Sequence, residues 1–235
     1  MSERVACVVG VVGSPLTGKG LFAHEWIAAP GVQLRLVWSP VEATDKYCER
    51  LAAPPTLSIV AMVAALKNGA PSIVFVPSQE PEAMEKQFDR FCRVAWQCEG
   101  SRVLVEELSR VTTAGWSPPA WRNITTAGSH RGLEVMGTIQ RAARVDKDFF
   151  DACTEIRCYR QNRAADAAAI AAEIPGATAD EIRRLPERAY LHFHRPDRLE
   201  RGVQPLPPGA RAQAPRPARS RTARKNKSTR KPPLP

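Results

Sequence analysis

The sequence has no run of 18 or more uncharged apolar residues, so an ordinary membrane-spanning helix is not expected. We also expect no signal peptide, because its apolar stretch 5–12 leads straight into a glycine loop without a small-residue cleavage site. The six cysteines form no CxxC pair, and their closest spacings, C-x5-C and C-x4-C, match no common zinc pattern. We therefore expect a cytosolic protein with reduced, mostly buried thiols.

Acidic residues are missing from the last 35 positions. Residues 1–200 hold 24 basic and 24 acidic side chains, whereas residues 201–235 hold 10 basic and none acidic, so the whole net charge of +10 lies there. This segment also contains eight of the 21 prolines. Such a composition cannot bury enough apolar surface to offset its ordering entropy, which predicts a globular domain over 1–200 and a disordered tail over 201–235.

The basic tail has the composition of a nonspecific polyanion binder. Flexible polycations bind phosphate backbones by counterion release, with an affinity that falls steeply with salt. The tail has no aromatic residue for base stacking, so we expect it to contact duplex DNA or phosphates rather than single strands. An anionic lipid surface would attract the same charges, and a tail that only aids solubility is a third reading.

Short β-rich runs alternate with segments long enough for helices. The runs lie at 5–12, 34–38, 72–76, 102–106 and 133–138, and helical spacing of apolar residues marks 82–97 and 162–172. The first run is apolar throughout, as expected for a parallel strand that is buried on both faces. This rhythm predicts an α/β fold with a mostly parallel sheet flanked by helices.

A phosphate-binding pattern follows the first predicted strand directly. The segment reads Gly13, Ser14, Pro15, Leu16, Thr17, Gly18, Lys19 and Gly20, and a helical pattern starts at Leu21. Glycines in such a loop let backbone amides converge on an anion, the helix start adds a positive dipole end, and the lysine adds a full charge. We expect the nine residues 13–21, from Gly13 to Leu21, to bind the nucleotide, here ATP.

One hydroxyl that this pattern normally carries is missing. The residue after Lys19 is Gly20, where the motif has a serine or threonine that binds Mg²⁺. Thr17, Ser14 or a water molecule would have to replace it. A chance glycine turn is the alternative interpretation, which the preceding strand disfavours.

Two acidic residues end the fourth predicted strand. In nucleotide hydrolases, such a strand carries an acid that holds the water shell of the metal and a second acid that polarises the attacking water. This order makes Glu106 the water-mediated Mg²⁺ ligand and Glu107 the general base, although an acidic pair at a solvated strand end would look similar. Gln140, at the tip of the fifth strand, is expected to sense the terminal phosphate.

The order of these motifs resembles the FtsK/HerA branch of P-loop ATPases, and within it the genome-packaging ATPases of tailless, membrane-containing phages. The resemblance covers about residues 5–195 and is carried by GSPLTGKG at 13–20, VLVEELSRVT at 103–112 and HRGLEVMGTIQRAARVDKDFFDACTEIRCYR at 130–160. It implies a RecA/FtsK-like core and a ring, commonly hexameric, that hydrolyses ATP to translocate double-stranded DNA.

The resemblance also gives roles to arginines. It implies that Arg131 contacts the γ-phosphate in a neighbouring subunit of the ring, with Arg141 and Arg122 as rivals and a surface position as the plain alternative. It further implies action in the host cytoplasm or on the virion, where vertex proteins would be partners.

Two other functions stay open. An assembly or export ATPase of filamentous phages, similar to the zonular-occludens-toxin group, shares this core but usually has a membrane span. A scaffold that binds nucleotide without hydrolysing it would suit the departures at Gly20 and Glu106. Finally, His192 and His194 share one face of a predicted terminal strand, but the sequence shows too few further ligands to predict zinc binding.

Overall fold

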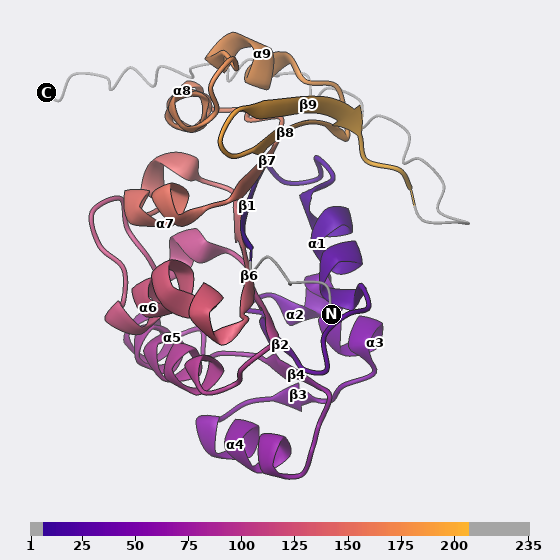
Figure 1. Ribbon diagram of the computed structural model, residues 1–235, viewed down its shortest axis with the longest axis vertical. Helices are drawn as coiled ribbons and strands as arrows, with labels where there is room; N and C mark the ends of the chain where they lie inside the picture. Colours follow the sequence, from indigo (N-terminus) through magenta and orange to yellow (C-terminus); the bar gives the residue numbers. More distant parts are fainter. Residues whose placement is uncertain (1–6, 207–235) are drawn as a thin grey trace, which may run out of the picture. The chain divides into compact units, whose positions relative to one another are not determined.

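The computed structural model describes residues 7–206. Its centre is a sheet of nine strands in the order β3-β4-β2-β5-β6-β1-β7-β8-β9 (Figure 1). The strands are β1 Val8–Val12, β2 Arg35–Trp38, β3 Pro55–Thr56, β4 Ser72–Phe75, β5 Arg102–Val105, β6 Glu134–Ile139, β7 Glu155–Tyr159, β8 Ala189–His194 and β9 Arg198–Val203. All neighbours from β3 to β7 pair in parallel, and β8 and β9 join antiparallel at one side.

Helices cover both faces of this sheet. They are α1 Lys19–Ala28, α2 Glu42–Asp45, α3 Tyr47–Leu51, α4 Ile59–Lys67, α5 Pro81–Trp96, α6 Pro119–Ala127, α7 Lys147–Ala152, α8 Ala164–Glu173 and α9 Ala179–Arg184, with short 3-10 turns at Leu108–Arg110, Gly128–Arg131 and Ala142–Arg144. Helices α1 to α3 lie on one face, and α5 to α7 lie on the other (Figure 1). The α/β prediction is confirmed.

The hydrophobic core has two parts, one on each face of the sheet. The larger one packs α5, α6, α7, α8 and α9 against the sheet and includes the aromatic cluster of Trp38, Phe88 and Trp121. The smaller one packs α1 and α3 around Val11, Ile27 and other fully buried side chains. Strands that are apolar on both faces, such as β1, are thus explained by burial on both sides.

Residues 198–203 form a strand, although the sequence suggested that the domain ends at residue 200. β9 pairs with β8 along its whole length, and the side chain of Gln204 is buried beyond it. The expected domain boundary at residue 200 therefore falls inside β9. The rest of the expected tail, residues 207–235, lies outside the described residues.

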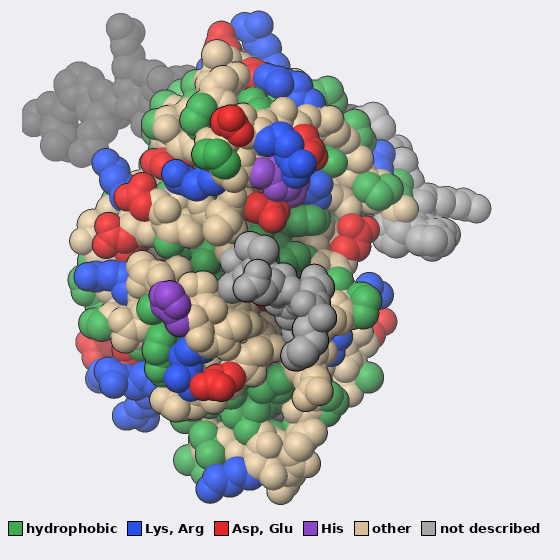
Figure 2. Space-filling model, in the orientation of Figure 1, with side chains coloured by type: hydrophobic (Ala, Val, Ile, Leu, Met, Phe, Trp, Pro, Cys, Tyr) green, Lys and Arg blue, Asp and Glu red, His purple; other side chains and the backbone are tan. Residues whose placement is uncertain are grey.

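The surface of the described part carries both charge signs. Basic and acidic side chains are interspersed over the face in Figure 2, as the equal numbers of both kinds in residues 1–200 predict. Across residues 7–206, none of the helices has the length and apolar character needed to cross a membrane.

Candidate functional site

The phosphate loop connects β1 to α1 at the carboxyl ends of the parallel strands. Its first two amides continue the sheet, since Gly13 N donates to Ile139 O at 2.9 Å and Ser14 N to Arg160 O at 3.0 Å. The hydroxyl of Ser14 accepts from Asn162 N at 3.0 Å. The loop is therefore tied to the ends of the two strands, β6 and β7, that flank β1.

Two glycines of the loop are required by its shape. A Cβ at Gly13 would lie 2.7 Å from Thr17 Oγ1 and 2.9 Å from Tyr159 Cβ, so a side chain does not fit there. Gly18 has a φ of 110°, which side chains strongly disfavour. Leu16 is also left-handed, with a φ of 64°, and its side chain is 76% exposed. Successive turns of this kind form the concave amide arrangement that binds anions.

The start of α1 supplies free backbone donors. The first helical hydrogen bond runs from Phe22 N to Gly18 O at 3.3 Å, so the amides of Lys19, Gly20 and Leu21 precede the helical hydrogen bonds. The side chain of Lys19 is mostly buried, with 11% of its surface exposed. Amides, helix dipole and ammonium group thus all favour an anion at one place.

The second acid of the predicted pair faces this lysine. Lys19 Nζ lies 3.7 Å from Glu107 Oε1, and Gln140 Nε2 donates a hydrogen bond to the same oxygen. The carboxylate is brought there by the end of β5 and by the left-handed backbone of Glu107, whose φ is 55°. Lys19, Glu107 and Gln140 come from the ends of three different strands or loops and meet at one edge of the sheet.

The first acid of the pair is buried and accepts a hydrogen bond on each of its two oxygens. Glu106 accepts a hydroxyl from Tyr47 on one carboxylate oxygen and from Thr138 on the other. Thr138 also accepts from Glu107 N at 3.1 Å, so it links the two acids to β6. Burial and the neighbouring Glu106 hold the pKa of Tyr47 well above its usual range, so its hydroxyl stays a donor.

Sequence reasoning missed the residues that surround Glu106 on the side of α2 and α3. His24 stacks on Tyr47 with ring centroids 4.3 Å apart, and its Nε2 donates to Asp45 O at 2.6 Å. These residues carry no motif, and only the packing of α3 against α1 brings them to the site. The sequence placed Thr138 in a predicted strand, but it did not show that the side chain of Thr138 points toward Glu106.

The missing hydroxyl after Lys19 leaves open space. A Cβ built at Gly20 would have no heavy atom within 4 Å. The two hydroxyls considered as replacements are used inside the fold: Thr17 Oγ1 donates to Ser14 O at 2.8 Å, and Ser14 Oγ accepts from Asn162 N. Because both residues are buried, water is the replacement that the structure favours among the three suggested.

The arginines predicted for the neighbouring subunit are each bound to other groups of the fold. Arg131 precedes the amino end of β6, at the opposite edge of the sheet, where Nε donates to Trp96 O at 2.7 Å and Nη2 lies 2.9 Å from Glu99 Oε1. Arg141 is paired with the buried Asp166 at 2.9 Å. Arg122, on α6, hydrogen-bonds to Ser117. The structure thus joins every predicted catalytic side chain except Arg131.

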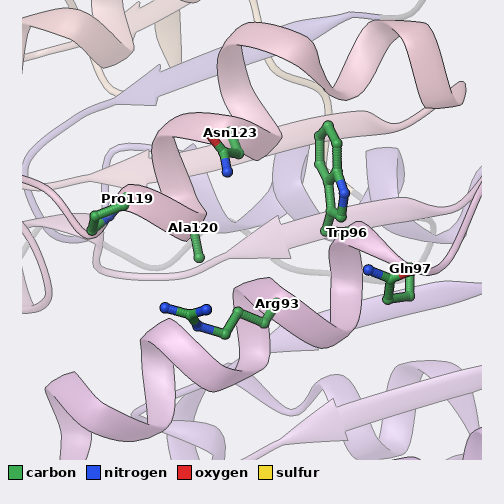
Figure 3. Close-up of a pocket in the computed structure, with 6 residues that line it drawn as sticks. All are labelled: Arg93, Trp96, Gln97, Pro119, Ala120 and Asn123. Carbon is green, nitrogen blue, oxygen red and sulfur yellow. The ribbon is translucent and has the colours of Figure 1, made fainter.

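A separate cavity of about 320 Å³ lies between α5 and α6, on the face of the sheet opposite α1. Its lining comprises Arg93, Trp96, Gln97, Pro119, Ala120 and Asn123, as Figure 3 shows. It contains one cationic side chain and no carboxylate, so it cannot bind phosphates and also activate water. The cluster at the carboxyl edge is the better candidate site.

Solved structures with a similar fold include a viral genome-packaging NTPase and VirB4. No protein-family model matches the sequence, and neither does any curated protein. The genome-packaging NTPase B204 from Sulfolobus turreted icosahedral virus 2, in complex with AMP, is 13% identical with a TM-score of 0.65, over 88% of this chain and all of that one. VirB4 of Thermoanaerobacter pseudethanolicus is 10% identical with a TM-score of 0.64, over 88% of this chain and 92% of that chain.

The amino-terminal domain of the zonular occludens toxin from Neisseria meningitidis is a more distant match. It is 15% identical with a TM-score of 0.50, over 87% of this chain and 96% of that one. These likenesses show that the chain has a P-loop NTPase fold, as the resemblance in its motifs implies.

Asp45 should make the stability of the protein depend on pH. Burial, together with Glu106 and Glu107, raises the pKa of its carboxyl from 3.8 to about 7, against the opposing effect of Lys19. The folded state then keeps a proton that the unfolded chain has lost, so stability falls as pH rises between these two values. Asp45→Asn should raise the melting temperature at pH 8, and this effect should shrink steadily as the pH falls toward 3.8, the pKa of the unfolded carboxyl.

Thermal unfolding followed by circular dichroism over this pH range checks the prediction. The matched control is Asp197→Asn, at an exposed position after β8. Equal effects of both substitutions at every pH would show that Asp45 titrates as an ordinary exposed acid.

Proposed function

We propose that this chain is an ATP hydrolase that moves double-stranded DNA, and that it packages a phage genome. The observation that carries the proposal is the meeting of Lys19, Glu107 and Gln140 beside the phosphate loop, with Lys19 Nζ 3.7 Å from Glu107 Oε1. A cation and a general base at one anion site are what phosphoryl transfer to water needs. The common fold with B204 and VirB4 supports the proposal.

The phosphates of ATP would bind the amides at the start of α1 and the ammonium group of Lys19. In the structure, Lys19 and Gln140 both contact the carboxylate of Glu107. A terminal phosphate would compete for both side chains and free this carboxylate to take a proton from the attacking water. Gln140 would then report whether the phosphate is present.

Mg²⁺, when bound, would neutralise charge on the transferred phosphate. The residues present fit it through water only, because Gly20 has no hydroxyl and both oxygens of Glu106 accept protein hydroxyls. Mg²⁺ commonly keeps several waters in proteins, so such a site is compatible with its chemistry. The role of Glu106 would be to hold that water shell.

A ring assembly, proposed here as a hexamer, would complete the site. Arg131 lies at the edge of the sheet opposite Lys19, so it cannot reach the phosphate of its own subunit. If it acts in catalysis, it must act in a neighbouring one, after release from Glu99. An arginine that joins the site from another subunit stabilises the charge of the transition state. Virion vertex proteins are proposed partners of such a ring.

A nucleotide-binding scaffold without hydrolysis is the second candidate. It is favoured by the same two features that make the metal site unusual, the missing hydroxyl at Gly20 and the two protein hydroxyls that donate to Glu106. An export ATPase is a third, since the zonular occludens toxin domain has the same fold. Measuring ATP hydrolysis separates the scaffold from the two motors.

Hydrolysis of ATP should depend on both predicted catalytic charges. Lys19→Ala removes a charge from the phosphates and should lower the rate by about 100-fold or more, as removal of one transition-state interaction does. Glu107→Gln removes the base and should lower it by about 100- to 10,000-fold. Phosphate release is measured with and without duplex DNA, which should stimulate the unsubstituted protein.

Lys67→Ala, at an exposed position of α4, is the matched control and should keep the full rate. A wild-type protein that binds ATP but releases no phosphate favours the scaffold. Activity that survives both site substitutions contradicts the assignment of these residues.

Restoring the missing hydroxyl should strengthen Mg²⁺ binding. Gly20→Ser fits the open space, and its hydroxyl would sit where the motif normally places a metal ligand. We expect half-maximal ATPase activity at about tenfold less Mg²⁺, as one added metal contact worth about 1.4 kcal/mol would give. Gly20→Ala adds the same Cβ without the hydroxyl and is the control. If the two variants behave alike, the motif position does not reach the metal.

The basic segment beyond β9 should bind DNA by charge alone. Removing residues 207–235 takes away nine positive charges and leaves the described strands complete. The slope of log affinity against log salt should become shallower by about 0.9 for each phosphate that the segment neutralises in the full chain. Fluorescence anisotropy with duplex DNA measures this slope. An unchanged slope, or a defect seen only with anionic vesicles, would contradict a DNA-binding role.

A further inference from the structure

We infer a second site, a Zn²⁺ site formed by Glu155, His192 and His194 at the antiparallel side of the sheet. The i, i+2 spacing puts both histidines on one face of β8. Strand β7 pairs with β8 so that Glu155 lies directly opposite His194. The third ligand was invisible in the sequence because it comes from 37 positions earlier in the chain.

The separations of the donor atoms suit a single small cation. Glu155 Oε2 lies 2.9 Å from His192 Nε2 and 3.7 Å from His194 Nδ1, and all three donor atoms lie within 4.8 Å of one another. Zn²⁺ binds nitrogen and oxygen at about 2.0–2.1 Å, which places tetrahedral ligands about 3.3 Å apart. The two observed separations lie on either side of this value, so small side-chain rotations suffice.

The surroundings supply the features that orient metal ligands. Glu200 Oε2, on β9, lies 3.8 Å from His194 Nε2, the ring nitrogen that would not bind the metal. A carboxylate beside the free nitrogen of a metal-bound histidine fixes the tautomer and the ring orientation. His192 also contacts the edge of the Phe22 ring, with centroids 6.2 Å apart. Two hydrogen-bonded strands therefore hold the donors in a rigid frame.

Nearby positive charges are directed away from the donors. Arg157, opposite His192 in the sheet, stacks on the rings of Phe22 and Tyr190 and donates to Gln204 Oε1 at 3.0 Å. Arg198 Nε lies 3.2 Å from the other oxygen of Glu200. The negative charge of Glu155 is thus available to the metal.

The site can be reached from solvent and differs from the phosphate site. The side chains of His192, His194 and Glu155 are 9%, 21% and 30% exposed, respectively. Histidine side chains show at the surface over β7 and β8, beside acidic and basic ones (Figure 2). Glu155 pairs with Val9 at the amino end of β1, whereas the phosphate loop follows its carboxyl end. Three protein ligands leave a fourth position for water, and the ion would link β7 to β8.

The test titrates Zn²⁺ into the untagged full chain, stripped of metal and kept reduced, against a chromophoric chelator. We expect one ion per chain and a higher melting temperature with Zn²⁺. Glu155→Gln keeps the size of the side chain and should weaken binding by about 100-fold, and Glu200→Gln by about tenfold. His130→Gln, an exposed histidine after α6, is the control and should bind as the wild type does.

Cobalt gives a second readout that needs no variant. Co²⁺ bound by two imidazoles, a carboxylate and water should show the intense visible bands of four-coordinate cobalt. Absence of stoichiometric Zn²⁺ binding, equal binding by Glu155→Gln, or a charge-transfer band of cobalt bound to thiolate would each overturn the site.

Discussion

The contact between Lys19 and Glu107 depends on the order of three parallel strands. β6 lies between β1 and β5, and all three run in the same direction, so their carboxyl ends deliver the phosphate loop, Gln140 and the acidic pair to one edge. Burial on both faces keeps these strands in the interior of the sheet, because their apolar side chains would be exposed to water if either face were uncovered. The chemistry of the proposed site thus follows from a packing constraint.

Much of this arrangement could be predicted because its signals are local. An apolar strand followed by a glycine loop and a lysine specifies both the backbone shape and the charge at Lys19. The strand ends at Glu107 and Gln140 could be located from hydrophobic runs, and parallel pairing brings such ends together. The predicted strands at 34–38, 72–76, 102–106 and 133–138 are all present within a residue or two.

The rest depends on contacts between distant segments. Tyr47 and Asp45 reach Glu106 through the packing of short helices that have no sequence signature. The β8–β9 hairpin extends the domain past the expected boundary. The sequence did not indicate this, because β9 is mostly polar and exposed and shows little alternation of apolar and polar residues, so its composition resembles that of the tail. Glu155 meets His192 and His194 only through strand register. The neighbouring acids Glu106 and Glu107 also have different partners, which the sequence could not show. Glu106 accepts protein hydroxyls, whereas Glu107 faces Lys19 and Gln140.

A crystal structure with a slowly hydrolysed ATP analogue and Mg²⁺ would show whether Lys19 and Glu107 share one nucleotide. We predict phosphate oxygens on the amides at the start of α1 and on Lys19 Nζ, with Glu107 released from the lysine and facing the terminal phosphate. A nucleotide bound elsewhere, such as in the cavity between α5 and α6, with the contact between Lys19 and Glu107 intact, would contradict the shared site.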